Sequence, residues 1–189
     1  MAEPDYPEFK TYSARLRLVA LFVVITLFLA VWSYSYWISQ PPPVIWSSIL
    51  FAALIVATAI DLRSYILPDW ITLPLVLIGL WVGGNFGSGY FWACIGALFG
   101  FGLIAGLRWL WLRQRGIEAI GLGDAKLLAA GGAWLGPAGI PLSLLVASTM
   151  AILVMLLSGQ AQGRQAIPFG PFLAVGIWFA WCLGHLIAG

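Results

Sequence analysis

Apolar residues fill most of this chain in long runs that short polar stretches interrupt. The runs predict seven membrane-spanning helices. Their approximate bounds are Leu16–Ile38, Val44–Ile60, Ile71–Val82, Tyr90–Leu110, Ile120–Leu135, Pro141–Leu157 and Pro171–Ile187. A straight crossing needs about 20 apolar residues, so the third and fifth spans are short unless their flanks extend them. Short segments that contain Gly or Pro often line a cavity, because irregular backbone is tolerated in a membrane only where protein or water satisfies it.

Composition supports this fold class. Of the 189 residues, 62% are hydrophobic and 8% are charged, whereas about 25% charged is usual for a soluble domain. We therefore expect an all-α polytopic membrane protein, with residues 1–15 as a polar cytoplasmic tail and residues 16–189 as one transmembrane domain. The net charge of +2 is too small to suggest nucleic-acid binding. Cys94 and Cys182 lie in separate apolar runs without CxxC spacing, which argues against a zinc site or a disulfide framework.

The basic residues are distributed on one side only. With seven spans, all nine Lys and Arg residues fall on the same side, either in the tail and connections or within a few residues of the span ends that adjoin them. The positive-inside rule places that side in the cytoplasm, so we expect a cytoplasmic N-terminus and an external C-terminus. Asp61, Asp69 and Asp124 belong to the same cytoplasmic side.

Two of these aspartates stand directly beside apolar runs. Asp61 follows the run 49–60, and Asp124 closes the tetrapeptide Gly-Leu-Gly-Asp before the run 127–135. A carboxylate at membrane depth costs about 2.5–3.5 kcal/mol on insertion scales, so it is rarely without a role there. Each aspartate also has a simpler interpretation, because Asp61 can be an ordinary interfacial helix end and the helix dipole favours Asp124 near a helix start. Together they suggest paired acid–base chemistry.

The residues around Asp124 and at the start of the last span add to this hypothesis. Gly121 and Gly123 permit close approach of a facing helix or of a substrate strand. Lys126 points to a different helical face from Asp124, and we expect it to reach toward the lipid headgroups. The sequence Ile167–Phe172 contains two prolines, which fit either a helix start or a non-helical segment that lines a cavity.

Small residues also recur at four-residue spacing within the predicted spans. The pairs are Gly96–Gly100, Gly102–Gly106 and Gly132–Gly136. Such spacings let helices approach closely, and we expect all three pairs to pack inside the bundle.

Three motifs in this order resemble those of the type IV prepilin peptidases, which are membrane aspartyl proteases of the Gly-x-Gly-Asp group. They are residues 61–69, 121–128 and 167–171, and the resemblance covers roughly residues 45–175. It implies that Asp61 and Asp124 are the catalytic residues. It implies supporting or substrate-site roles for Gly121, Gly123, Asp69, Lys126, Pro168, Gly170 and Pro171.

The resemblance also implies a substrate and a location. Prepilins and pseudopilins of type IV pili and type II secretion carry a basic leader and then a hydrophobic helix, and cleavage follows a glycine at the cytoplasmic face of the bacterial inner membrane. The lipid bilayer is then the other partner, and neither a metal nor an organic cofactor is expected. Many members carry two CxxC pairs associated with N-methylation; this chain has no CxxC, so methyltransferase activity is not expected. The alternatives are a small proton- or cation-coupled transporter that uses the same aspartates, and a structural membrane anchor.

Overall fold

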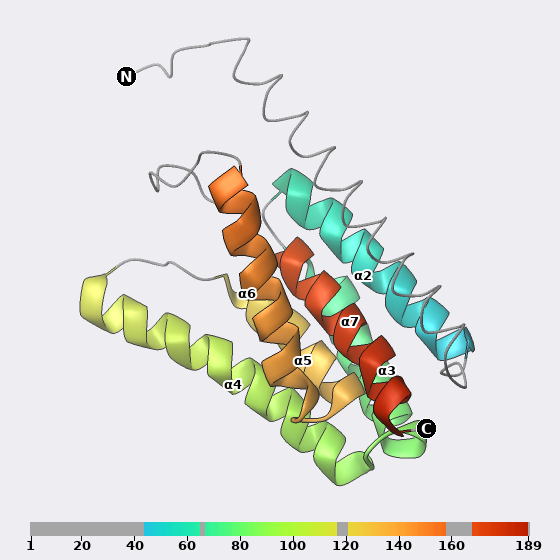
Figure 1. The fold of residues 1–189 in the computed structure, drawn as a ribbon. Helices are drawn as coiled ribbons and strands as arrows, with labels where there is room; N and C mark the ends of the chain where they lie inside the picture. The colour runs from blue at the N-terminus through green and yellow to red at the C-terminus, as the bar shows by residue number, and fades with distance from the viewer. Residues whose placement is uncertain (1–43, 65–66, 117–120, 158–167, 189) are drawn as a thin grey trace.

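The computed structural model describes residues 44–64, 67–116, 121–157 and 168–188. These residues form helices only, which confirms the predicted all-α class for this part of the chain (Figure 1). The helices are α2 (Val44–Ser64), α3 (Asp69–Phe86), α4 (Tyr90–Arg115), α5 (Leu122–Leu135), α6 (Gly139–Leu157) and α7 (Gly170–Ala188). The predicted tail and first span lie outside the described residues.

Six helices therefore follow the second to seventh predicted spans, with shifted ends. Helix α3 begins two residues early, at Asp69 after the extended Pro68, and α4 continues beyond the predicted Leu110 to Arg115. Helices α2, α3, α4 and α6 are long and apolar enough to cross a membrane. Helix α5 has only 14 residues, and the apolar part of α7 is also shorter than a full span. The count of seven spans stays a prediction.

The short helix α5 lies at the centre of the bundle, in contact with α3, α4, α6 and α7. Its residues from 127 to 134 are all buried, and most of them are Ala or Gly. A Cβ atom on Gly100 of α4 would lie 2.5 Å from the Leu128 carbonyl oxygen of α5, so the two backbones touch there. Gly96 and Gly132 face each other in the same way. Small side chains therefore allow a helix too short for a full crossing to be enclosed by its neighbours.

The pair Gly102–Gly106 behaves differently. No described atom outside the helix's own backbone lies within 4 Å of a Cβ built on Gly102 or Gly106. The expectation that this pair packs inside the bundle was wrong, because it lies on a face of α4 that no described helix covers. Four-residue spacing places two glycines on one face but does not identify the neighbour of that face.

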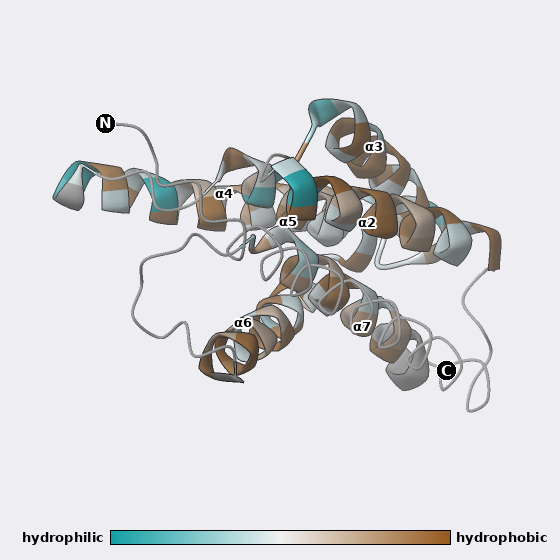
Figure 2. Ribbon diagram, turned by 90° about the horizontal axis from the view of Figure 1, so that it is seen from above, coloured by the Kyte–Doolittle hydropathy of each residue, from teal (hydrophilic) through white to brown (hydrophobic). Residues whose placement is uncertain are grey.

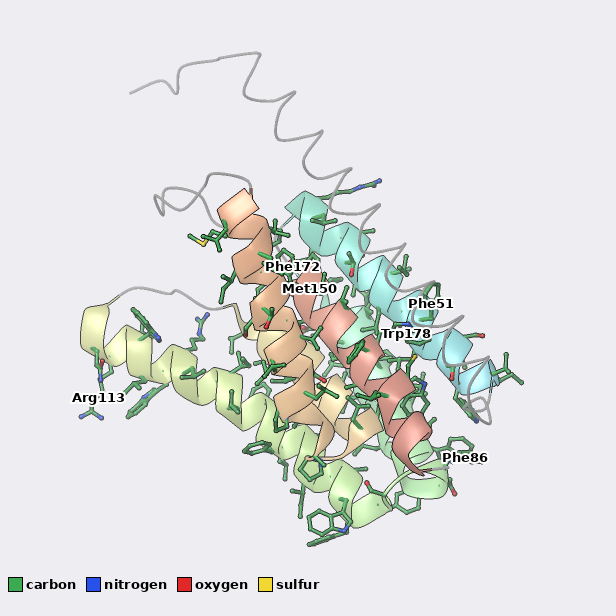
Figure 3. The ribbon with its side chains drawn as sticks, viewed as in Figure 1. Phe51, Phe86, Arg113, Met150, Phe172 and Trp178 are labelled. Atoms are coloured by element: carbon green, nitrogen blue, oxygen red, sulfur yellow. The ribbon has the colours of Figure 1, made fainter. Side chains whose placement is uncertain are left out.

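Helices α2 and α7 pack with a fixed antiparallel register. The buried residues of α2 recur every three or four positions, as in Leu54, Thr58 and Asp61, and form one interior stripe. The Trp181 Nε1–H donates a hydrogen bond of 3.0 Å to the Ser47 hydroxyl. One turn later, the rings of Phe51 and Trp178 lie 5.2 Å apart (Figure 3). Continued along both helices, this register brings the end of α2 to the start of α7, where the polar residues of the site lie.

Candidate active site

Asp61 lies in the last turn of α2 and is 5% exposed. Its carboxylate faces the first turn of α7, where the backbone N–H of Gly170 hydrogen-bonds to it. The C-terminal end of its own helix disfavours a negative charge, whereas the N-terminal end of α7 favours one. Among the described residues, Oδ2 of this carboxylate has no hydrogen-bond partner. The carboxylate is therefore held on one side and left unsatisfied on the other.

Asp124 comes from a different helix and lies in the first turn of α5, where the dipole of its own helix favours its charge. It is partly buried, and the charge of Asp61 acts on it directly. The structure thus brings together the two aspartates that the sequence singled out, although they lie 63 positions apart in the chain. Two interacting carboxylates cannot both ionise cheaply, so such a pair shares one proton.

Leu67 lies between the segments that carry these carboxylates, and sequence reasoning did not single it out. It is 6% exposed. A Cβ on Gly123 would lie 2.8 Å from the Leu67 Cβ, and a Cβ on Gly170 would lie 3.3 Å from its Cδ1. Leu67 therefore packs between the two glycine-containing helix starts. Its one sequence signal is its position before Pro68, and that signal does not distinguish it from an ordinary apolar residue of the connection.

The three predicted site glycines differ in how tightly they are enclosed. A Cβ on Gly170 would lie 2.6 Å from Oδ2 of Asp61, and a Cβ on Gly123 would lie 2.8 Å from the Leu67 Cβ. Gly121 is looser, because its nearest neighbour is Oδ2 of Asp124 at 3.8 Å, an ordinary contact. Gly170 and Gly123 are thus required by close approach, whereas Gly121 is not. Pro168 lies two residues before α7, outside regular secondary structure, and Pro171 lies in the first turn of that helix.

Lys126 forms an ion pair with Asp69. The pair joins the first turn of α3 to α5, and the side chain of Asp69 is 58% exposed whereas that of Lys126 is 29% exposed. Lys126 is thus paired with a carboxylate from the start of another helix, and its expected reach toward the lipid headgroups stays a prediction. Asp69 therefore has a cation as its partner, while Asp61 has another carboxylate. Across the described ranges, no three His, Cys, Asp or Glu side chains gather in a way that could hold a metal ion.

The family model described as "Type IV leader peptidase family" matches residues 48–156, more than half of the 189 residues. The chain belongs to the type IV leader peptidase family. The matched region contains Asp61, Leu67, Gly123 and Asp124, and thus both carboxylates of the site.

Several curated proteins share this region, and each bears the name "Prepilin leader peptidase/N-methyltransferase". The one from Burkholderia pseudomallei is 45% identical over 132 residues, which cover 67% of this chain and 42% of the relative. The one from Aeromonas hydrophila is 42% identical over 141 residues, covering 71% of this chain and 48% of the relative. The Xanthomonas campestris protein is 34% identical over 182 residues, covering 93% of this chain and 61% of the relative. The chain thus spans about half the length of the relatives it matches. No solved structure matches it.

Proposed function

We propose that this protein is a membrane aspartyl endopeptidase that removes the basic leader from type IV prepilins or pseudopilins, cutting after glycine at the cytoplasmic face of the inner membrane. One observation carries the proposal: two carboxylates from separate helix ends interact inside the region that matches the leader peptidase family. Family membership supports the substrate class, and the carboxylate pair supports the aspartic type. Methylation of the new N-terminus is not part of the proposal.

In this mechanism the pair begins with one shared proton. The ionised carboxylate takes a proton from a water molecule, whose oxygen attacks the scissile carbonyl carbon, while the protonated carboxyl donates its proton to the carbonyl oxygen. The tetrahedral intermediate then breaks its C–N bond, and the departing amine takes a proton from the first carboxyl group. The second carboxylate regains the proton that it gave to the carbonyl oxygen. Atoms and charge balance, and the pair returns to its initial state.

The distribution of polar residues supports a site at one end of the bundle. The C-terminal end of α2 and the N-terminal end of α7 lie at the same end (Figure 1). Viewed from that end, the most hydrophilic positions lie on the outer turns of α4 and on the first turns of α3 and α5 (Figure 2). Arg63 in the last turn of α2 and Arg113 near the end of α4 belong to this end. Positive residues favour the cytoplasmic side, so the proposal places this end there.

The test is cleavage by the purified protein in detergent or liposomes. The substrate is a peptide with a basic leader, a glycine and a hydrophobic stretch, and mass spectrometry locates the cut. The proposal expects cleavage after the glycine, and none when the glycine is replaced by a bulky residue. Proton flux into liposomes without any cleavage would favour the transporter instead. Failure to cleave prepilin-like peptides that other family members cleave would contradict the proposal.

A further inference from the structure

Thr58 carries a buried hydroxyl group that the mechanism above does not use. The residue is 1% exposed, and its Oγ1 has no hydrogen-bond partner among the described residues. A buried polar group left unpaired costs about 1–3 kcal/mol, so such a group calls for an explanation. In the described part of the chain, the other side-chain atom in this condition is Oδ2 of Asp61.

Other helical hydroxyls in this protein behave differently from Thr58. A Ser or Thr inside a helix commonly donates to the carbonyl oxygen four residues earlier. Within the described residues, five hydroxyl groups do so, at distances from 2.7 to 3.5 Å, whether exposed or buried. They belong to Ser48, Ser64, Thr72, Ser143 and Thr149. The same bond is open to Thr58 from its own helix, yet its hydroxyl does not make it.

The two unsatisfied groups are neighbours on one face of α2. Thr58 precedes Asp61 by three residues, and both belong to the interior stripe that faces α7. Side chains three residues apart on a helix lie about 5–6 Å apart at Cβ. At that separation, a hydroxyl can reach a carboxylate oxygen directly or through one water molecule. One group is a donor and the other an acceptor, so each supplies what the other lacks.

We propose that Thr58 is a positioning residue for Asp61: its hydroxyl donates to the Oδ2 side of the carboxylate, directly or through one ordered water, during turnover. The inference rests on the proposed function, since it assumes that Asp61 is catalytic. The Gly170 N–H holds the carboxylate from α7, and Thr58 holds it from α2. Two fixed contacts orient the carboxylate toward Asp124 and the scissile bond, which is the orientation that a proton transfer requires.

The experiment compares Thr58→Val with Thr58→Ser in the peptide-cleavage assay. Val keeps the shape but removes the hydroxyl, so we expect kcat about tenfold lower with KM nearly unchanged, and Ser should restore most of kcat. Thr72→Val is the matched control: Thr72 is also fully buried, but its hydroxyl is satisfied by the Pro68 carbonyl oxygen. We expect kcat for this control to stay within about twofold of the wild type.

Thermal unfolding in detergent separates positioning from folding. Removal of an unpaired buried hydroxyl by an isosteric side chain should leave the melting temperature of Thr58→Val unchanged or higher. Wild-type kcat in Thr58→Val would overturn the inference. So would a loss of kcat that Ser does not restore, or one that the Thr72 control shares. None of these results would affect the proposed function, which the wild-type protein tests by cleaving the same peptide.

Discussion

Two pairs of charged residues lie at the same end of this molecule and differ in almost every respect. Asp61 and Asp124 are both carboxyl groups and are buried or partly buried, and Oδ2 of Asp61 has no hydrogen-bond partner among the described residues. Asp69 and Lys126 carry opposite charges, are 58% and 29% exposed respectively, and form an ion pair with each other. Folding stability favours an ion pair such as the second one, whereas burying two carboxyl groups beside each other costs free energy in a folded protein. Costly arrangements of this kind concentrate at functional sites, which is why we assign chemistry to the first pair and tethering to the second.

The largest expected effect comes from neutralising either carboxylate of the first pair. Asp61→Asn and Asp124→Asn each keep the size of the side chain but cannot exchange a proton. We expect each to lower kcat by about a thousandfold or more, with normal membrane insertion. Cleavage of the leader peptide measures the loss, and gel filtration in detergent checks that the variants are folded. Turnover within tenfold of wild type in either variant would show that the pair is misassigned.

A smaller effect should follow from displacing Asp61 without removing it. In Gly170→Ala the new Cβ would lie 2.6 Å from Oδ2 of Asp61, too close for ordinary contact, so the carboxylate must shift. A displacement of about 1 Å can cost roughly a hundredfold in rate, and we expect a loss of kcat between tenfold and a hundredfold.

Gly121→Ala is the matched control for this substitution. Its Cβ would meet Oδ2 of Asp124 at 3.8 Å, and its backbone is in an extended conformation that Ala adopts freely. Kinetics of the same peptide should show kcat within about threefold of wild type. Equal losses in both glycine variants would mean that the close approach at Gly170 does not position the carboxylate.

The smallest effect should come from the second pair. Lys126→Met and Asp69→Asn each remove one charge from a partly exposed ion pair, which contributes at most about 1 kcal/mol to stability. We expect kcat to fall by less than about fivefold, and the double variant to be no worse than the more affected single one. Thermal unfolding and cleavage kinetics of all three variants provide the double-mutant cycle. A thousandfold loss on Lys126→Met would erase the distinction between the two pairs.

Much of the fold could be predicted from the sequence, because apolar runs long enough to cross a lipid bilayer directly indicate helices. The ends of the helices could not be predicted as well. Helix α4 continues to Arg115, five residues beyond the end of the predicted span, and the last three of these residues are polar. The sequence also could not identify which helix a given helix face contacts. Gly96 and Gly102 lie in glycine spacings of the same kind, yet Gly96 faces α5 and Gly102 has no close neighbour in the described part of the chain.

The residues of the site likewise include some that the sequence could identify as candidates and others that it could not. Asp61 and Asp124 could be identified because a charge beside an apolar run stands out against its surroundings. The Asp69–Lys126 pair could not, since 57 residues separate its partners. Leu67 and Thr58 are ordinary residues in the sequence, and their places beside the glycines and the carboxylate depend on how separate helices are packed.

The central claim is that Asp61 and Asp124 act as one unit that shares a single proton. The pH dependence of kcat/KM for peptide cleavage by the wild-type protein tests it most directly. A shared proton requires one ionised and one protonated group, so the profile should be bell-shaped: activity falls at low pH when both are protonated and at high pH when both are ionised. The Gly121→Ala variant should reproduce the same two limbs. A profile with a single limb, across the range in which the protein stays folded, would contradict the claim.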